Sequence, residues 1–161
     1  MATKIGSLVA GIGAKMAATF PTYSVVYGLP DGTGTYGPNG GEVYVHFAQE
    51  SGEFSGNQLG GVSIVSPTIS VSVWRSLSAS STLLATQQSL IDLAADLRVA
   101  ILAMVLAHVD GSATISGLSG SSLWVTDYTM TTAQIDIGAG QSTESVTAEF
   151  TFKLSSTYGS R

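Results

Sequence analysis

The most recognisable chemical pattern in the chain is a run of glycines at positions 32, 34 and 37, spaced as in a dinucleotide-binding fingerprint. In that fingerprint the glycines follow a buried strand and open a helix whose N-terminus holds a pyrophosphate. Here Pro38, Gly40 and Gly41 follow the run, and such a composition does not open a helix. We therefore interpret the segment as part of a glycine-rich loop over residues 28–41.

Histidine and aspartate are the other residue types that could carry catalysis or bind a metal. His46 and His108 are the only histidines, they lie far apart, and neither belongs to a metal-binding spacing motif. Asp92 and Asp96 are one helical turn apart and could form a carboxylate pair. We interpret them instead as part of a solvated helix face beside Arg98. Cysteine is absent, and no G-x-S-x-G nucleophile motif occurs. We predict no catalytic residue, no metal site and no cofactor, and expect a protein that is not an enzyme.

The composition favours a folded subunit that is covered by neighbours. Hydrophobic residues make up 44% of the 161 residues, which excludes disorder across the whole chain, whereas charged residues make up only 11%. A surface so poor in charge is typical of a protein that buries much of its exterior. The net charge of −5 argues against electrostatic binding to nucleic acid.

Two apolar segments must be distinguished from membrane signals. The first has apolar residues at helical spacing and predicts an amphipathic helix over about residues 4–19, which ends before Pro21. Lys15 and three glycines interrupt this stretch, so a secretory signal is the less favoured interpretation. The second, residues 99–109, is shorter than the roughly 20 residues of a membrane span. We therefore expect a buried helix there and no membrane association.

Alternating apolar residues predict strands over residues 23–27, 42–47, 62–74, 123–137 and 146–154. A long helix is predicted over about residues 80–109, and the residues from 155 onward are expected to fray. The loops 28–41 and 48–61 are predicted to be mobile until a partner orders them, with Tyr36 and Phe54 as anchors. The fold class is therefore α+β. A single domain, residues 1–161, holds one mostly antiparallel sheet flanked by the N-terminal helix and the long central helix.

Two features of these elements indicate contacts with other subunits. The C-terminal half of the long helix is apolar nearly all round, so Leu102 and Leu106 are expected at an interface. Trp74 lies opposite the apolar face of its strand, where either a helix covers it or a partner does. The first of these alternatives places one helix on each face of the sheet.

The order of elements resembles that of the tail terminator (tail completion) proteins of long-tailed bacteriophages. The resemblance covers most of the chain and depends on architecture more than on single residues. It is carried by the strand at residues 68–75 (TISVSVWR), the helical stretch at residues 89–110 directly after it, and the closing strand at residues 146–154 (VTAEFTFKL).

This resemblance implies a ring, most simply a hexamer, at the head-proximal end of the virion tail, assembled in the host cytoplasm. The ring would bind the tail tube protein, stop its polymerisation and dock to a head–tail connector or stopper protein, while DNA passes through without specific binding. The alternatives are a tail-tube subunit, a head–tail connector or a small non-enzymatic binding module. If the ring conducts DNA, acidic side chains should line its lumen. The candidates are Glu42, Glu50, Glu53, Asp127, Asp136, Glu144 and Glu149, of which Glu144 and Glu149 fall on opposite faces of one strand.

Overall fold

The computed structural model describes residues 3–30, 36, 40–54, 62–76, 83–138 and 141–157. Its first element is helix α1, Lys4–Thr19, which begins where the Thr3 side chain accepts a hydrogen bond from the Gly6 N–H at 3.0 Å. The helix ends at Thr19, and Phe20 caps it immediately before Pro21, as the sequence predicts. Leu8, Ile12 and Met16 form its buried stripe.

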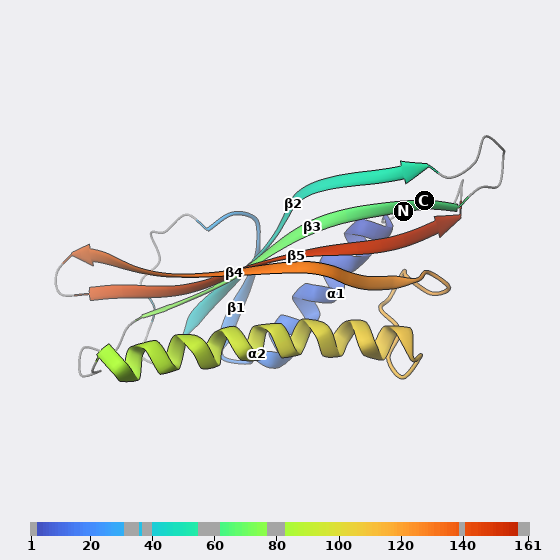
Figure 1. The fold of residues 1–161 in the computed structure, drawn as a ribbon. Coiled ribbons are helices and arrows are strands. Elements are labelled where there is room, and N and C mark those ends of the chain that lie inside the picture. The colour runs from blue at the N-terminus through green and yellow to red at the C-terminus, as the bar shows by residue number, and fades with distance from the viewer. Residues whose placement is uncertain are drawn as a thin grey trace.

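Five strands form one sheet in the order β1-β2-β3-β5-β4 (Figure 1). Strand β1 is parallel to β2, and the other neighbouring pairs are antiparallel. The bounds of the strands are β1 Tyr23–Tyr27, β2 Gly41–Phe54, β3 Val62–Ser76, β4 Leu123–Gly138 and β5 Gln141–Thr157. Helix α2, Leu83–Val109, joins β3 to β4. The predicted α+β class, with a mostly antiparallel sheet and two helices, is therefore confirmed.

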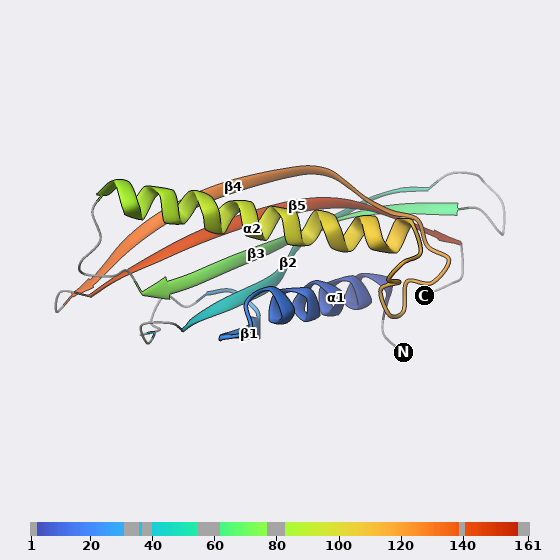
Figure 2. The same ribbon diagram turned by 90° about the horizontal axis from the view of Figure 1, so that it is seen from below.

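Both helices lie on the same face of the sheet (Figure 2). Helix α1 packs on β1 and β2, α2 packs on β4 and β5, and the two helices also contact each other. The alternative with one helix on each face is wrong. The reason is visible in the strands, because only one side of each central strand is apolar and only that side can receive the apolar stripe of a helix.

The core lies between this side of the sheet and the helices. Strands β2, β3 and β5 supply alternate residues to it, and α2 supplies one stripe. Its fully buried members include Val43, Val71, Phe150, Phe152, Leu97 and Ile101.

The strands are longer than the alternation of apolar residues predicts. Residues 48–54 belong to β2, so the prediction of a loop that starts at residue 48 is wrong, and residues 55–61 lie outside the described part. A bulge between Phe47 and Gln49 interrupts the alternation, and pairing with β3 continues the strand beyond it. Residues 155–157, expected to fray, belong to β5. Of the predicted loop 28–41, only residues 28–30, 36 and 40–41 are described.

The connection between α2 and β4 is held by His108. Its Nδ1 accepts a hydrogen bond from the Ile115 N–H at 3.2 Å, and its Nε2 lies 2.9 Å from the Ser121 carbonyl oxygen. Since Nδ1 accepts a hydrogen bond, Nε2 carries the ring proton and donates a hydrogen bond to the Ser121 carbonyl oxygen. His108 is buried and fixes the connection that follows the helix. Among the helices described here, none combines the length and apolar character needed to span a membrane.

Candidate functional site

Acidic and basic side chains are the first groups that could form a functional site. Within the described ranges, no cluster of three or more histidine, aspartate or glutamate side chains is placed to hold a metal ion. Asp92 and Asp96 are exposed and line a hollow of about 520 Å³ together with Arg75 and Tyr23. The Arg75 guanidinium in this hollow is already bound by the protein itself.

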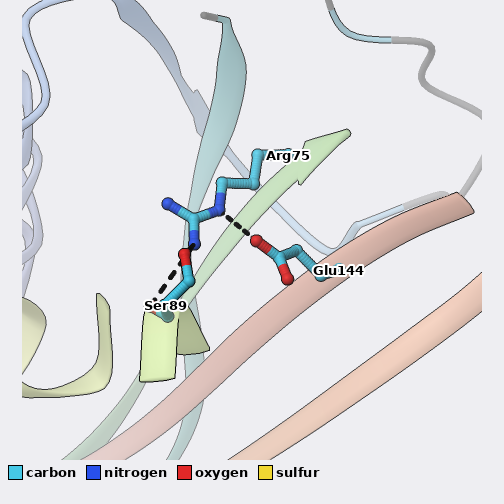
Figure 3. A network of polar contacts seen from close by, with 3 residues as sticks. All are labelled: Arg75, Ser89 and Glu144. Carbon is cyan, nitrogen blue, oxygen red and sulfur yellow. Dashed lines mark hydrogen bonds and ion pairs between the residues drawn. The ribbon is translucent and has the colours of Figure 1, made fainter. Parts of the chain in front are cut away.

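Arg75, Glu144 and Ser89 form a network on the helix side of the sheet (Figure 3). The Arg75 Nε donates to Glu144 at 2.5 Å, and its Nη2 donates to the Ser89 carbonyl at 3.3 Å and to the Ser89 hydroxyl. Burial alone would lower the pKa of Arg75, but the hydrogen bond and charge of Glu144 raise it above its usual value. The network links β3, β5 and α2 in one place.

Glu144 is one of the candidates predicted to face the lumen, and the structure shows that this prediction is wrong. Its side chain is buried beneath α2, because it lies on the same side of β5 as the core residue Val146. Glu149 is exposed on the other side of that strand, so the predicted division between these two residues is confirmed. Glu144 therefore stabilises the subunit and does not face an aqueous channel.

The side of the sheet opposite the two described helices, which we call the bare face, carries mostly hydroxyl side chains. Those of Thr129 and Thr131 are exposed, whereas those of Thr68 and Ser72 are buried. Hydroxyls of this face pair across β3 and β5, where the Ser72 and Thr147 hydroxyls lie 2.7 Å apart and those of Thr68 and Thr151 3.2 Å apart. The Trp74 indole N–H donates to the Ser72 hydroxyl at 2.6 Å, and Trp74 is only 9% exposed. Trp74 is thus largely covered within the subunit, although no helix covers it.

A second group on the bare face joins Tyr36, Glu42 and Tyr44. Both phenolic hydroxyls donate to the same carboxylate oxygen of Glu42, that of Tyr36 at 3.1 Å. Burial, and then the hydrogen bond to Glu42, raise the pKa of Tyr44 above its usual value. The Tyr36 carbonyl also accepts from the Ser76 hydroxyl at 2.7 Å. Tyr36, predicted to become anchored on a partner, is therefore anchored on its own sheet.

The remaining acidic candidates divide between the two faces. Asp127 pairs with Thr151 and is exposed on the bare face, as are Glu149 and the partly exposed Glu42. Glu50 is exposed, but it pairs with Pro67 and so belongs to the helix side of the sheet. The side chains of Glu53, Phe54 and Asp136 lie outside the described part of the chain. Glu42, Asp127 and Glu149 thus share one face.

The outer surface of α2 is apolar, as the sequence predicts for its C-terminal half. Leu102 and Leu106 belong to a row of aliphatic side chains that are 41–68% exposed. This row lies opposite the buried stripe of the helix, and we call it the α2 ridge. Its members are Leu84, Ile91, Val99, Leu102, Leu106 and Val109. Exposed apolar side chains that gather on one side of a helix are typical of an interaction surface.

The two edges of the sheet are features that the sequence analysis missed. Strand β4 forms one edge and β1 part of the other, and no further described strand pairs with either (Figure 2). Large apolar side chains lie exposed beside them, with Tyr27 and Leu29 at the β1 edge and Tyr128 in β4. A signal was available, because the segment around Tyr128 combines strand-forming residues with few charges.

Comparison with solved structures gives a distant likeness. No family model matches the chain, and no curated protein does. A chain in a solved structure described as "Virion of native gene transfer agent (GTA) particle" is similar to this one, with 17% identity and a TM-score of 0.37. The alignment covers 92% of this chain and 96% of that chain. A likeness of this size identifies no family.

Proposed function

We propose that this protein is a structural subunit of a phage-like virion that forms a closed ring and acts as the tail terminator. In this role it caps the head-proximal end of the tail tube, stops tube polymerisation and offers a docking surface to the head–tail connector. The observation that carries the proposal is the division of the subunit into two unlike faces. One face of the sheet holds both helices, and the other is bare, hydroxyl-lined and acidic.

The bare face suits the wall of a channel through which DNA moves. Glu42, Asp127 and Glu149 place carboxylates on it, and Lys153 is the described lysine on the same face, opposite Trp124 in β4. A face with hydroxyls and more carboxylates than lysines carries excess negative charge, which repels phosphates. DNA would therefore pass such a wall without being held.

The width of the sheet is compatible with a ring of this kind. Five strands at about 4.8 Å each span about 24 Å, so six copies side by side would enclose a circle about 45 Å across. This opening admits duplex DNA. The other support for the proposal is the order of helices and strands, which resembles that expected of a tail terminator.

Electron microscopy of the purified protein in negative stain, combined with mass measurement by light scattering, tests the proposal. Rings of one diameter that do not lengthen as the concentration rises are the expected result. Long tubes would favour the tail-tube alternative. A single 16.5 kDa species at high concentration would contradict the ring and favour a small binding module.

A further inference from the structure

We propose that the outer edge of β4 pairs with the outer edge of β1 in a second copy of this chain, as antiparallel strands. This inference rests on the proposed function, because it names the contact that closes the ring. A sheet edge presents unpaired N–H and C=O groups, and pairing with another strand satisfies them.

Within the stretches that would face each other, neither edge carries a lysine, a proline or a bulge. Natural edges are protected by lysine, proline, bulges or very short strands. Residues 128–135 of β4 (YTMTTAQI) contain no charge and no proline. The two bulges of β4 lie on either side of this stretch, between Val125 and Asp127 and between Asp136 and Gly138. The sequence of β1, YSVVY, is equally uncharged.

The directions and heights of the two edges also agree. Strand β1 runs parallel to β2, and each step from β2 through β3 and β5 to β4 reverses direction. Strands β1 and β4 are therefore antiparallel, and the rotation that relates copies in a ring preserves this. The register of the sheet places Tyr23 level with Gln134 and Tyr27 level with Met130. Each residue of β1 thus has a counterpart on β4 at its own height.

The faces match as well. Met130 and Tyr27 both lie on the helix side of the sheet, whereas Ala133 and Ser24 both lie on the bare face and are exposed. A shift of the pairing by one residue would exchange the faces, but a shift by two would keep them. The pairing therefore continues the two-faced sheet from one copy to the next.

The same contact covers apolar side chains that are exposed in the isolated subunit. Leu29 of the second copy would lie near Tyr128, and these two side chains are 69% and 40% exposed. The α2 ridge lies close to this junction, because Arg98 on α2 reaches the Tyr128 hydroxyl at 3.4 Å and Leu102 is one turn further along. Since α2 packs beneath β4 and α1 beneath β1, the joined edges bring the ridge to α1 of the second copy.

Engineered disulfides test the pairing, since the chain has no cysteine of its own. A variant with Ser24→Cys and Ala133→Cys carries one thiol on each edge. Four strand spacings, about 19 Å, separate the two positions within a chain, far beyond the reach of a disulfide. Because strands in a closed sheet are staggered, Ser24→Cys is also combined with Thr131→Cys or Thr129→Cys. One of these three variants should give a ladder of covalent oligomers on a non-reducing denaturing gel, ending at the size of the ring.

A matched control combines Ser24→Cys with Glu149→Cys, which is exposed on the bare face but in the interior strand β5, and should give no ladder. Rings in the microscope with no ladder from any of the three variants would overturn the edge pairing and leave the proposed ring intact. A ladder without rings would keep the pairing and overturn the ring. The absence of both the rings and the ladder would overturn the edge pairing and the proposed ring together.

A charge pair on the bare face gives a second measurement. Ser24→Lys is combined with lysine at the β4 position that formed the disulfide, as Ala133→Lys, Thr131→Lys or Thr129→Lys. This places like charges opposite each other and should raise the concentration needed for assembly several-fold. Ser24→Glu with the same β4 substitution should restore assembly toward that of the parent protein. Equal assembly of the two variants would count against the pairing.

Discussion

Arg75 and Glu144 form an ion pair between β3 and β5 that α2 covers. Glu144→Gln keeps the shape of the side chain but leaves the guanidinium without its counter-charge. We expect the free energy of unfolding to fall by about 1–3 kcal/mol, less than for a fully buried pair, because the Arg75 side chain is 22% exposed. Urea denaturation measures this. Glu149→Gln, an exposed change in the same strand, is the control and should be nearly neutral.

Tyr44 couples stability to alkaline pH. Its pKa is raised in the folded state by burial and by Glu42, whereas the phenol of an unfolded chain ionises near about pH 10. The contribution of Tyr44 is therefore complete below about pH 10 and is lost as the pH rises above that value. Denaturant titrations between about pH 8 and 11 should show a shallower loss of stability in Tyr44→Phe than in the parent protein. Identical slopes would contradict this assignment.

Alanine substitutions at Gly117 and Gly120 distinguish the cost of backbone strain from the cost of a steric collision. Both have positive φ, +83° and +74°, but a methyl group at position 117 would collide with the Ser7 hydroxyl, whereas at position 120 it meets open space. Gly120→Ala should cost about 1 kcal/mol from the left-handed backbone alone. Gly117→Ala should cost more, and Ser7→Ala should recover part of the difference. Thermal unfolding of the three variants measures both terms.

The elements differ in how far their sequence determines them. Helix α1 and strand β1 have the predicted bounds, because a cap and a proline limit the helix and the strand is short. Strand β2 extends beyond residue 47 because it pairs with β3, and such pairing leaves no apolar alternation to detect. The common side of both helices follows from which strand faces are apolar, and this appears only when all strands are aligned.

The candidate surfaces were predictable to different degrees. The C-terminal part of the α2 ridge was visible in the sequence, because that half of the helix is apolar nearly all round and includes Leu102 and Leu106. Leu84 and Ile91 at the other end were not predicted. The burial of Glu144 was not visible, because its partner Arg75 is 69 residues away in the sequence. The β4 edge was also missed, because strand order is a property of the whole sheet and not of any segment.

The α2 ridge can be altered without unfolding the subunit. Leu102 and Leu106 are exposed, whereas Leu97 is fully buried. Leu102→Glu and Leu106→Glu should retain the circular dichroism spectrum of the parent but weaken assembly, because a charge would enter an apolar contact. Leu97→Glu should unfold the protein. Folded rings from both ridge variants would show that the ridge is no subunit contact.

The charge of the whole molecule predicts its behaviour with DNA. With a net charge of −5, the free protein should bind duplex DNA negligibly even at low salt. Asp127→Lys combined with Glu149→Lys replaces two carboxylates of the bare face and should produce binding that weakens as salt rises. A salt titration of DNA binding measures both proteins. Tight, salt-sensitive binding by the parent would favour a connector that grips DNA.

The position of both helices on one face gives the subunit a built-in direction of curvature. Helices add bulk to one side of the sheet only, so each copy is broader on its helix side than on its bare side. Wedges of this kind, laid edge to edge, can close only with the narrow side inward. In the proposed ring, the face that becomes the inside is therefore set when the single chain folds, before it meets any other component.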